Sequence, residues 1–101
     1  MKKIYISQPM RGRSTDAIIA ERKALVADAA VALQTDEVEV LDTYLNGYTN
    51  KPPLHLLALA LEKMADADAV IFAPGWRDAR GCRVEHLAAS EYGISIIHAK
   101  G

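Results

Sequence analysis

Glu85 is the residue of this sequence best suited to covalent chemistry. A predicted helix begins near Gly81, so the Glu85 carboxylate falls in its first turn or just beyond, where the helix dipole favours the ionised form. An ionised carboxylate that is held in place can act as a nucleophile toward an electrophilic sugar carbon. Acidic residues in first turns are also common as plain helix stabilisers, and position alone favours that second interpretation.

The segment from Ser7 to Arg13 could bind an anion. It combines a hydroxyl, two guanidinium groups and a glycine ahead of a predicted helix, a composition that can hold a phosphate or a carboxylate. A solvated turn is the alternative interpretation. The segment 74–85 also contains arginines. A cleft formed by the two segments would therefore be locally basic, although the net charge of the chain is -1.

Four other side chains could serve either the site or the structure. Trp76 could be a stacking platform for a base, although a lid over the core is the favoured interpretation. Asp42 and Asp68 flank the ends of predicted strands, where each could protonate a leaving group or cap a loop. Tyr5 lies on the opposite face of its predicted strand from the isoleucines beside it, so its hydroxyl either stays in the core or reaches the site.

The composition is that of an ordinary globular domain. Of the 101 residues, 50% are hydrophobic and 25% are charged, with the two signs nearly balanced, so we expect one core and no nucleic-acid polymer as a partner. The longest aliphatic run, residues 56–61, is far shorter than the roughly 20 residues that span a bilayer. Cys82 is the only cysteine, which fits a reducing compartment. We therefore expect a cytoplasmic protein that has no membrane partner.

Metal and cofactor motifs are not expected to contribute. Neither the phosphate-loop pattern nor the G-x-G-x-x-G fingerprint of dinucleotide-binding domains occurs in the sequence. His55, His86 and His98 lie on different predicted elements, without the spacing of metal ligands. The sequence therefore predicts no metal site and no cofactor.

Strands and helices that could position these residues alternate along the chain. The segment 37–41 alternates charged and apolar residues, as an edge strand does, whereas 69–73 is continuously apolar, as a central strand is. Alternating elements pair in parallel, so we predict one α/β domain over residues 1–101: a Rossmann-like or flavodoxin-like three-layer open parallel sheet of about four strands, in the order 2-1-3-4. The predicted strands are 4–6, 37–41, 69–73 and 94–97, and the predicted helices are 16–33, 53–65 and 81–92.

In such a sheet, ligands bind beyond the carboxyl ends of the strands where the winding reverses, which here is between the first and third strands. Both segments described above leave from those two ends. The helix 53–65 has apolar residues on two faces, and a domain this small can cover only one of them. We expect a homo-oligomer that buries the second face, most simply a twofold dimer.

Three segments together resemble a known group of proteins. They are Lys3–Gly12, Ala67–Trp76 and Gly81–Glu85. In this order they resemble a family of small uncharacterised domains common in phages and prophages, related to the nucleoside 2-deoxyribosyltransferase superfamily. The resemblance covers nearly the whole chain.

The resemblance implies cleavage of the N-glycosidic bond of a nucleoside or deoxynucleotide, by hydrolysis or by deoxyribosyl transfer. The glutamate of the superfamily, matched by Glu85, attacks the sugar C1′ and displaces the base. Asp68 best matches the aspartate that assists departure of the base, and Tyr5 matches a tyrosine of the first strand. In related deoxynucleoside-monophosphate glycosidases the first loop binds the 5′-phosphate, and Arg11 and Gly12 stand at the corresponding positions.

The expected ligand is therefore a nucleoside or nucleotide. Ala79 stands close to the position where many relatives carry a phosphate-binding serine, so a non-catalytic nucleotide-binding or regulatory module of the same fold is the alternative. The residues that we expect to bind the substrate are Ser7, Gln8, Met10, Arg11, Gly12, Asp42, Gly75, Trp76, Arg80 and Gly81.

Overall fold

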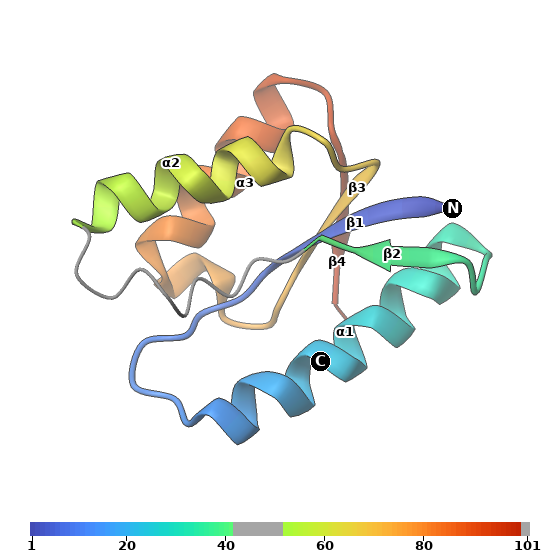
Figure 1. Cartoon of the computed structure of the whole chain (residues 1–101), viewed down its shortest axis with the longest axis horizontal. Helices are drawn as coiled ribbons and strands as arrows, with labels where there is room; N and C mark the ends of the chain where they lie inside the picture. The colour runs from blue at the N-terminus through green and yellow to red at the C-terminus, as the bar shows by residue number, and fades with distance from the viewer. Residues whose placement is uncertain (42–51, 100–101) are drawn as a thin grey trace.

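The fold is an all-parallel sheet between two layers of helices (Figure 1). The computed structural model describes residues 1–41 and 52–99. In this part of the chain the strand order is β2-β1-β3-β4, as predicted. The elements are β1 (Lys2–Ser7), α1 (Thr15–Leu33), β2 (Val38–Val40), α2 (Pro53–Met64), β3 (Ala69–Phe72), the short 3-10 helix η2 (Trp76–Asp78), α3 (Arg80–Glu91) and β4 (Ser95–His98).

The strands β1 and β3 form the middle of the sheet. Ile4 pairs with Ala69 and Ser7 with Phe72, so the carboxyl ends of the two strands lie side by side. Every residue of β3 is buried, which confirms the central strand predicted from its unbroken apolar run. The alternating segment forms β2 at the sheet edge, also as predicted.

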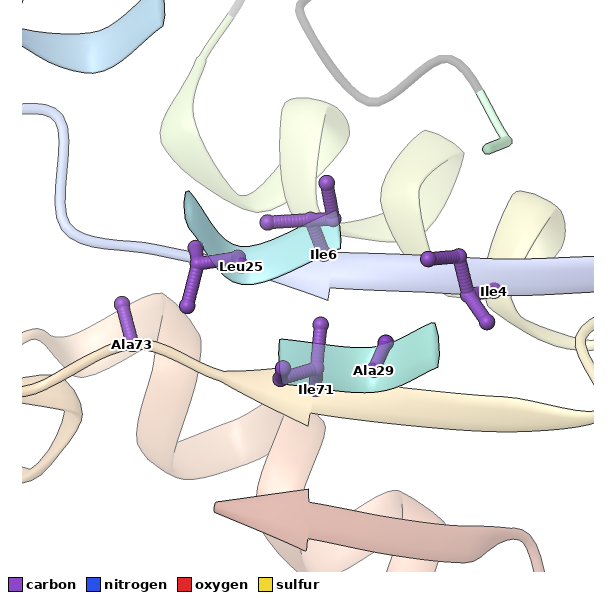
Figure 2. Close-up of a cluster of buried hydrophobic side chains, with 6 residues drawn as sticks. All are labelled: Ile4, Ile6, Leu25, Ala29, Ile71 and Ala73. Carbon is purple, nitrogen blue, oxygen red and sulfur yellow. The ribbon is translucent and has the colours of Figure 1, made fainter. Parts of the chain in front are cut away.

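Helix α1 covers one face of the sheet. Its first turn is capped by Ser14, whose Oγ accepts a hydrogen bond of 3.1 Å from the backbone N–H of Ala17. Leu25 and Ala29 pack from this helix against apolar side chains of β1 and of the β3 region (Figure 2). The buried members of this first core are Ile4, Ile6, Leu25, Ala29, Ile71 and Ala73.

Helices α2 and α3 cover the opposite face (Figure 1). Alternation along each strand divides the side chains between the faces, so Tyr5 and Phe72 turn to this second core, whereas their neighbours in the strands turn to α1. The buried members of the second core are Tyr5, Ala60, Met64, Val70, Phe72 and Ala89. Alternation therefore brings the Tyr5 side chain to the face that carries α3.

The predicted ends of the elements differ from the observed ends by at most two residues. Helix α3 starts at Arg80, one residue before Gly81, near which the sequence predicted its start. This start places Glu85 in the second turn of the helix, because an α-helix has 3.6 residues per turn. Ala79 occupies the N-cap position and makes no side-chain capping hydrogen bond.

Candidate active site

Two hydroxyl groups from β1 hold the carboxylate of Glu85. The Tyr5 hydroxyl donates a hydrogen bond to Oε2, and the Ser7 hydroxyl donates one of 2.7 Å to Oε1. Tyr5 and Ser7 are two residues apart in a strand, so their side chains point to the same face of the sheet and can reach one carboxylate. All three residues are buried. The structure therefore brings together Glu85, Tyr5 and Ser7, which the sequence analysis placed in the site.

Burial dominates the electrostatics of this carboxylate. It raises the pKa of Glu85, while the hydrogen bonds from Tyr5 and Ser7 lower it by a smaller amount. Burial and the neighbouring Glu85 also raise the pKa of the Tyr5 phenol, which therefore keeps its proton and remains a donor. Glu85 lies in the second turn of α3, just beyond the first, where stabilisation of an ionised side chain by the helix dipole is weaker.

Glu85 is one of the residues that line a cavity of about 700 Å³. The cavity opens beside the carboxyl end of β1, at the edge where the winding of the sheet reverses. In the described part of the chain, its polar lining comes mainly from Tyr5, Gln8, Arg80, Cys82 and Glu85. This volume is within the range of about 300–1,000 Å³ that is usual for small-molecule sites.

Helix α2 contributes an apolar wall that the sequence analysis missed. Leu56 and Leu57 line the cavity and are only partly buried. The wall also contains Pro52, Pro53, Leu54 and Ala60. The signal was present in the second apolar face of α2, which the sequence analysis assigned to a partner subunit alone. A wall of this kind suits the flat, apolar face of a ring.

Gln8 lines the cavity, but its amide group is turned toward α1. Nε2 donates hydrogen bonds to Oε1 of Glu21 (2.9 Å) and to the backbone carbonyl of Ile18 (3.4 Å). Its Oε1 accepts a hydrogen bond of 3.2 Å from Arg22. The amide of Gln8 is thus engaged by hydrogen bonds within the chain, and its contact with a substrate stays a prediction.

The remaining residues of the first loop divide between the cavity and the surface. Met10 is part of the cavity lining, whereas Arg11 and Gly12 are exposed and lie outside it. In the second loop, Arg80 and Gly81 line the cavity at the first turn of α3. Arg80 is the guanidinium that the described lining offers to a ligand.

Trp76 packs against the protein and does not line the cavity. Its ring stacks on His86 with a centroid distance of 4.1 Å and an interplanar angle of 8°. Phe72 lies against the same histidine at 4.8 Å. Gly75 precedes this cluster with a φ of 81°, a conformation that favours glycine. This arrangement matches the interpretation of Trp76 as a lid over the core.

Asp68 lies at the amino end of the strands, and Glu85 lies near their carboxyl end. It precedes β3, and its Oδ2 accepts a hydrogen bond of 2.7 Å from the backbone N–H of Lys3. In β1, Lys3 and Ser7 are four residues apart, which corresponds to about 13 Å of extended strand. The expectation that Asp68 acts beside Glu85 was therefore wrong. A residue that precedes a parallel strand lies at the opposite end of the strands from the residues that follow it. Asp42 lies outside the described residues.

Cys82 lies beside the same group of hydrogen-bonded residues and also lines the cavity. Burial raises the pKa of its thiol to about 11; hydrogen bonding with Ser7 lowers it, and the charge of Glu85 raises it. A thiol with this pKa is protonated at neutral pH, which makes it a poor nucleophile.

Residues 1–41 and 52–99 contain no group of three or more His, Cys, Asp or Glu side chains arranged to hold a metal ion. Within the same residues, no helix combines the length and the apolar character needed to cross a membrane.

The fold and the site define a small α/β domain with a ligand-sized cavity at the reversal point of its sheet and a buried glutamate in the cavity lining. The family model described as a domain of unknown function, DUF4406, matches residues 2–98, and the chain belongs to that family. Searches of curated proteins and of solved structures found no match to the chain.

Proposed function

We propose that the protein cleaves the N-glycosidic bond of a deoxynucleoside or of its 5′-monophosphate, with Glu85 as the nucleophile. The observation that carries the proposal is the buried Glu85 carboxylate in the cavity lining, with one hydroxyl donor on each oxygen. A carboxylate has about four acceptor positions, so the bonds from Tyr5 and Ser7 leave lone pairs free for attack. The resemblance of three ordered segments to the nucleoside 2-deoxyribosyltransferase superfamily supports the same chemistry.

In the proposed reaction, a carboxylate oxygen of Glu85 forms a bond to C1′ while the bond from C1′ to the base nitrogen breaks. The electron pair leaves with the base, which takes a proton from water in the cavity. A second water then attacks C1′ and gives a proton to the hydroxide that the first water became, the ester bond breaks, and the products are the free base, the sugar and the original carboxylate. Tyr5 and Ser7 keep the carboxylate in one orientation through both steps.

The cavity lining supports a ligand with an apolar ring and one anionic group. The residues of α2 offer the ring a flat apolar surface, and Arg80 offers the anion a guanidinium. Glu85 is the acidic residue in the described lining, so no second carboxylate from that lining protonates the leaving group.

The test is release of free base from the four common 2′-deoxynucleosides and their 5′-monophosphates. We expect release with at least one substrate and loss of at least a hundredfold in Glu85→Gln. Glu91→Gln is the matched control, because Glu91 lies in the same helix and is exposed. Base release that is undetectable with all eight compounds, or that survives in Glu85→Gln, contradicts the proposal.

A non-catalytic nucleotide-binding module is the second candidate function. It is favoured by the hydrogen bonds that both carboxylate oxygens of Glu85 already accept from the chain. A module of this kind would gain thermal stability with nucleotides, show no turnover, and bind equally well in Glu85→Gln. Measuring melting temperature and base release in the same samples separates the two candidates.

Oligomerisation and location complete the proposal. Leu59, on the second apolar face of α2, is only partly buried and does not line the cavity, so this face remains available to a second copy of the chain. We expect a homo-oligomer in the cytoplasm, and sedimentation of a monomer at micromolar concentration would contradict the first expectation.

A further inference from the structure

Glu21 joins the two ends of the loop that follows β1. Its Oε1 accepts a hydrogen bond of 2.9 Å from Nε2 of Gln8, at the start of the loop. The same oxygen accepts a second hydrogen bond, of 2.8 Å, from Arg13, at the end of the loop. Arg13 also donates to the carbonyl of Pro9 at 2.9 Å. One carboxylate on α1 therefore fixes a loop from both sides.

The loop between these fixed ends forms part of the cavity. The backbone N–H of Arg13 donates to the carbonyl of Met10 at 3.2 Å, and Gly12 has a φ of 77°. A positive φ at the third residue of such a turn is typical of type II geometry. Pro9 and Met10, on the near side of this turn, line the cavity. The position of this wall thus depends on contacts that lie outside the cavity.

The start of the loop is buried, which makes these contacts costly to lose. Gln8 is only 6% exposed. Without Glu21, its Nε2 would keep a single long hydrogen bond, of 3.4 Å, to the carbonyl of Ile18. A buried donor that loses its partner is expensive, so the loop would move to satisfy it. Arg13 would lose its only ion-pair partner in the described part of the chain.

We propose that Glu21 is a positioning residue for the ligand, acting through Gln8 and Arg13 on the wall formed by Pro9 and Met10. The inference rests on the proposed function for its ligand class, a deoxynucleoside 5′-monophosphate. Because the wall contacts the ligand equally before and during the reaction, its displacement weakens binding and leaves the chemical step alone. Glu21 does not line the cavity, so it acts without touching the substrate.

The first measurement is kinetic and uses the four common 2′-deoxynucleoside 5′-monophosphates. We expect Glu21→Ala to raise KM about tenfold with kcat within about twofold of wild type. A tenfold loss of affinity is about what the loss of one hydrogen bond to a charged group produces. Glu21→Gln retains an acceptor oxygen and should recover most of the loss. Lys23→Ala, an exposed change in the same helix, is the control.

The second measurement is hydrogen exchange in the protein without ligand, and it does not depend on activity. In Glu21→Ala the amide of Arg13 should exchange at least tenfold faster than in Lys23→Ala, while the amides of α1 exchange at the same rate in both variants. Unchanged protection of that amide overturns the inference even if the enzyme is active. Faster exchange with an unchanged KM overturns it too.

The proposed function can fail separately. If the wild type releases no base, dissociation constants of the same four nucleotides, measured by calorimetry, replace KM. Glu21→Ala should then weaken binding about tenfold while Glu21→Gln binds nearly normally. Equal affinity in all variants, or no binding by the wild type, would overturn the role of Glu21 in holding a ligand. A fall in kcat that matches the rise in KM would also overturn the inference, because displacement of a wall that contributes only to binding does not slow the chemical step.

Discussion

The hydroxyl of Tyr5 donates a hydrogen bond to Oε2 of Glu85 and so joins the central strand β1 to helix α3. The two residues are 80 positions apart in the sequence. Their contact forms because α3 packs on the face of the sheet to which Tyr5 points. The pair is buried, so the hydrogen bond contributes to the stability of the fold as well as to the site.

Tyr5→Phe should lower the free energy of unfolding by about 1–3 kcal/mol, because Oε2 of Glu85 would remain buried without that donor. It should also raise the pKa of Glu85 further, since the hydrogen bond from Tyr5 lowers that pKa. Urea denaturation at neutral pH measures the first effect. Tyr92→Phe is the matched control, because Tyr92 is 84% exposed and should change stability by less than about 0.5 kcal/mol. Equal stability of both variants would contradict the role of the Tyr5 hydroxyl.

The sequence was sufficient to predict the order of the sheet and the face on which Tyr5 lies. Both follow from local patterns: alternation of strands and helices gives the topology, and the two-residue period of a strand gives the face. The same rules could have placed Asp68 correctly, because a residue ahead of a parallel strand lies at its amino end. The partners of Gln8 could not be predicted, since they depend on side-chain rotamers and on how α1 sits against the loop.

The buried Glu85 carboxylate should make stability depend on pH. Its pKa is raised in the folded protein, so the contribution of Glu85 to stability is fully present below the ordinary glutamate pKa of about 4.3 and is lost as pH rises through the folded value. Unfolding free energies of wild type and Glu85→Gln, measured between pH 4 and pH 8, should therefore diverge in favour of the variant as pH rises. A constant difference across this range would show that the carboxyl group has the same pKa in both states.

Two glycines, one in the loop after β1 and one in α3, should respond to substitution in opposite directions. Gly12 has a φ of 77°, so Gly12→Ala should destabilise the protein by about 1–2 kcal/mol although its Cβ would meet nothing within 4 Å. Gly81 lies within α3 without a positive φ, and its Cβ would also meet nothing within 4 Å. Gly81→Ala should therefore stabilise the helix by up to about 1 kcal/mol. Thermal denaturation measures the stability of both variants. A loss of stability in Gly81→Ala would contradict the prediction and show that the Cβ of alanine is not tolerated at this position.

The ring of His86 should be replaceable by a phenyl ring. It packs between Phe72 and Trp76, and its Nε2 is buried without a hydrogen-bond partner in the described part of the chain. His86→Phe keeps a ring in this position and removes the unsatisfied nitrogen, so stability should be unchanged or higher by up to about 1 kcal/mol. His86→Ala removes the ring contacts and should be less stable than wild type. His55→Phe, at an exposed position of α2, controls for added apolar surface.

The pH dependence of the stability difference between His86→Phe and wild type shows whether the buried, unpaired nitrogen causes that difference. Burial, the charge of His98 and the charge of Arg77 lower the pKa of His86. The unfolded chain therefore takes up a proton first as pH falls below about 6.5, and wild type loses stability from there down through the folded pKa. Because His86→Phe lacks this group, its advantage in unfolding free energy should widen between pH 7 and pH 5, roughly the range over which an ordinary histidine titrates. If the advantage stays constant while His86→Ala is destabilised, the ring serves only packing, and burial, His98 and Arg77 do not oppose its protonation.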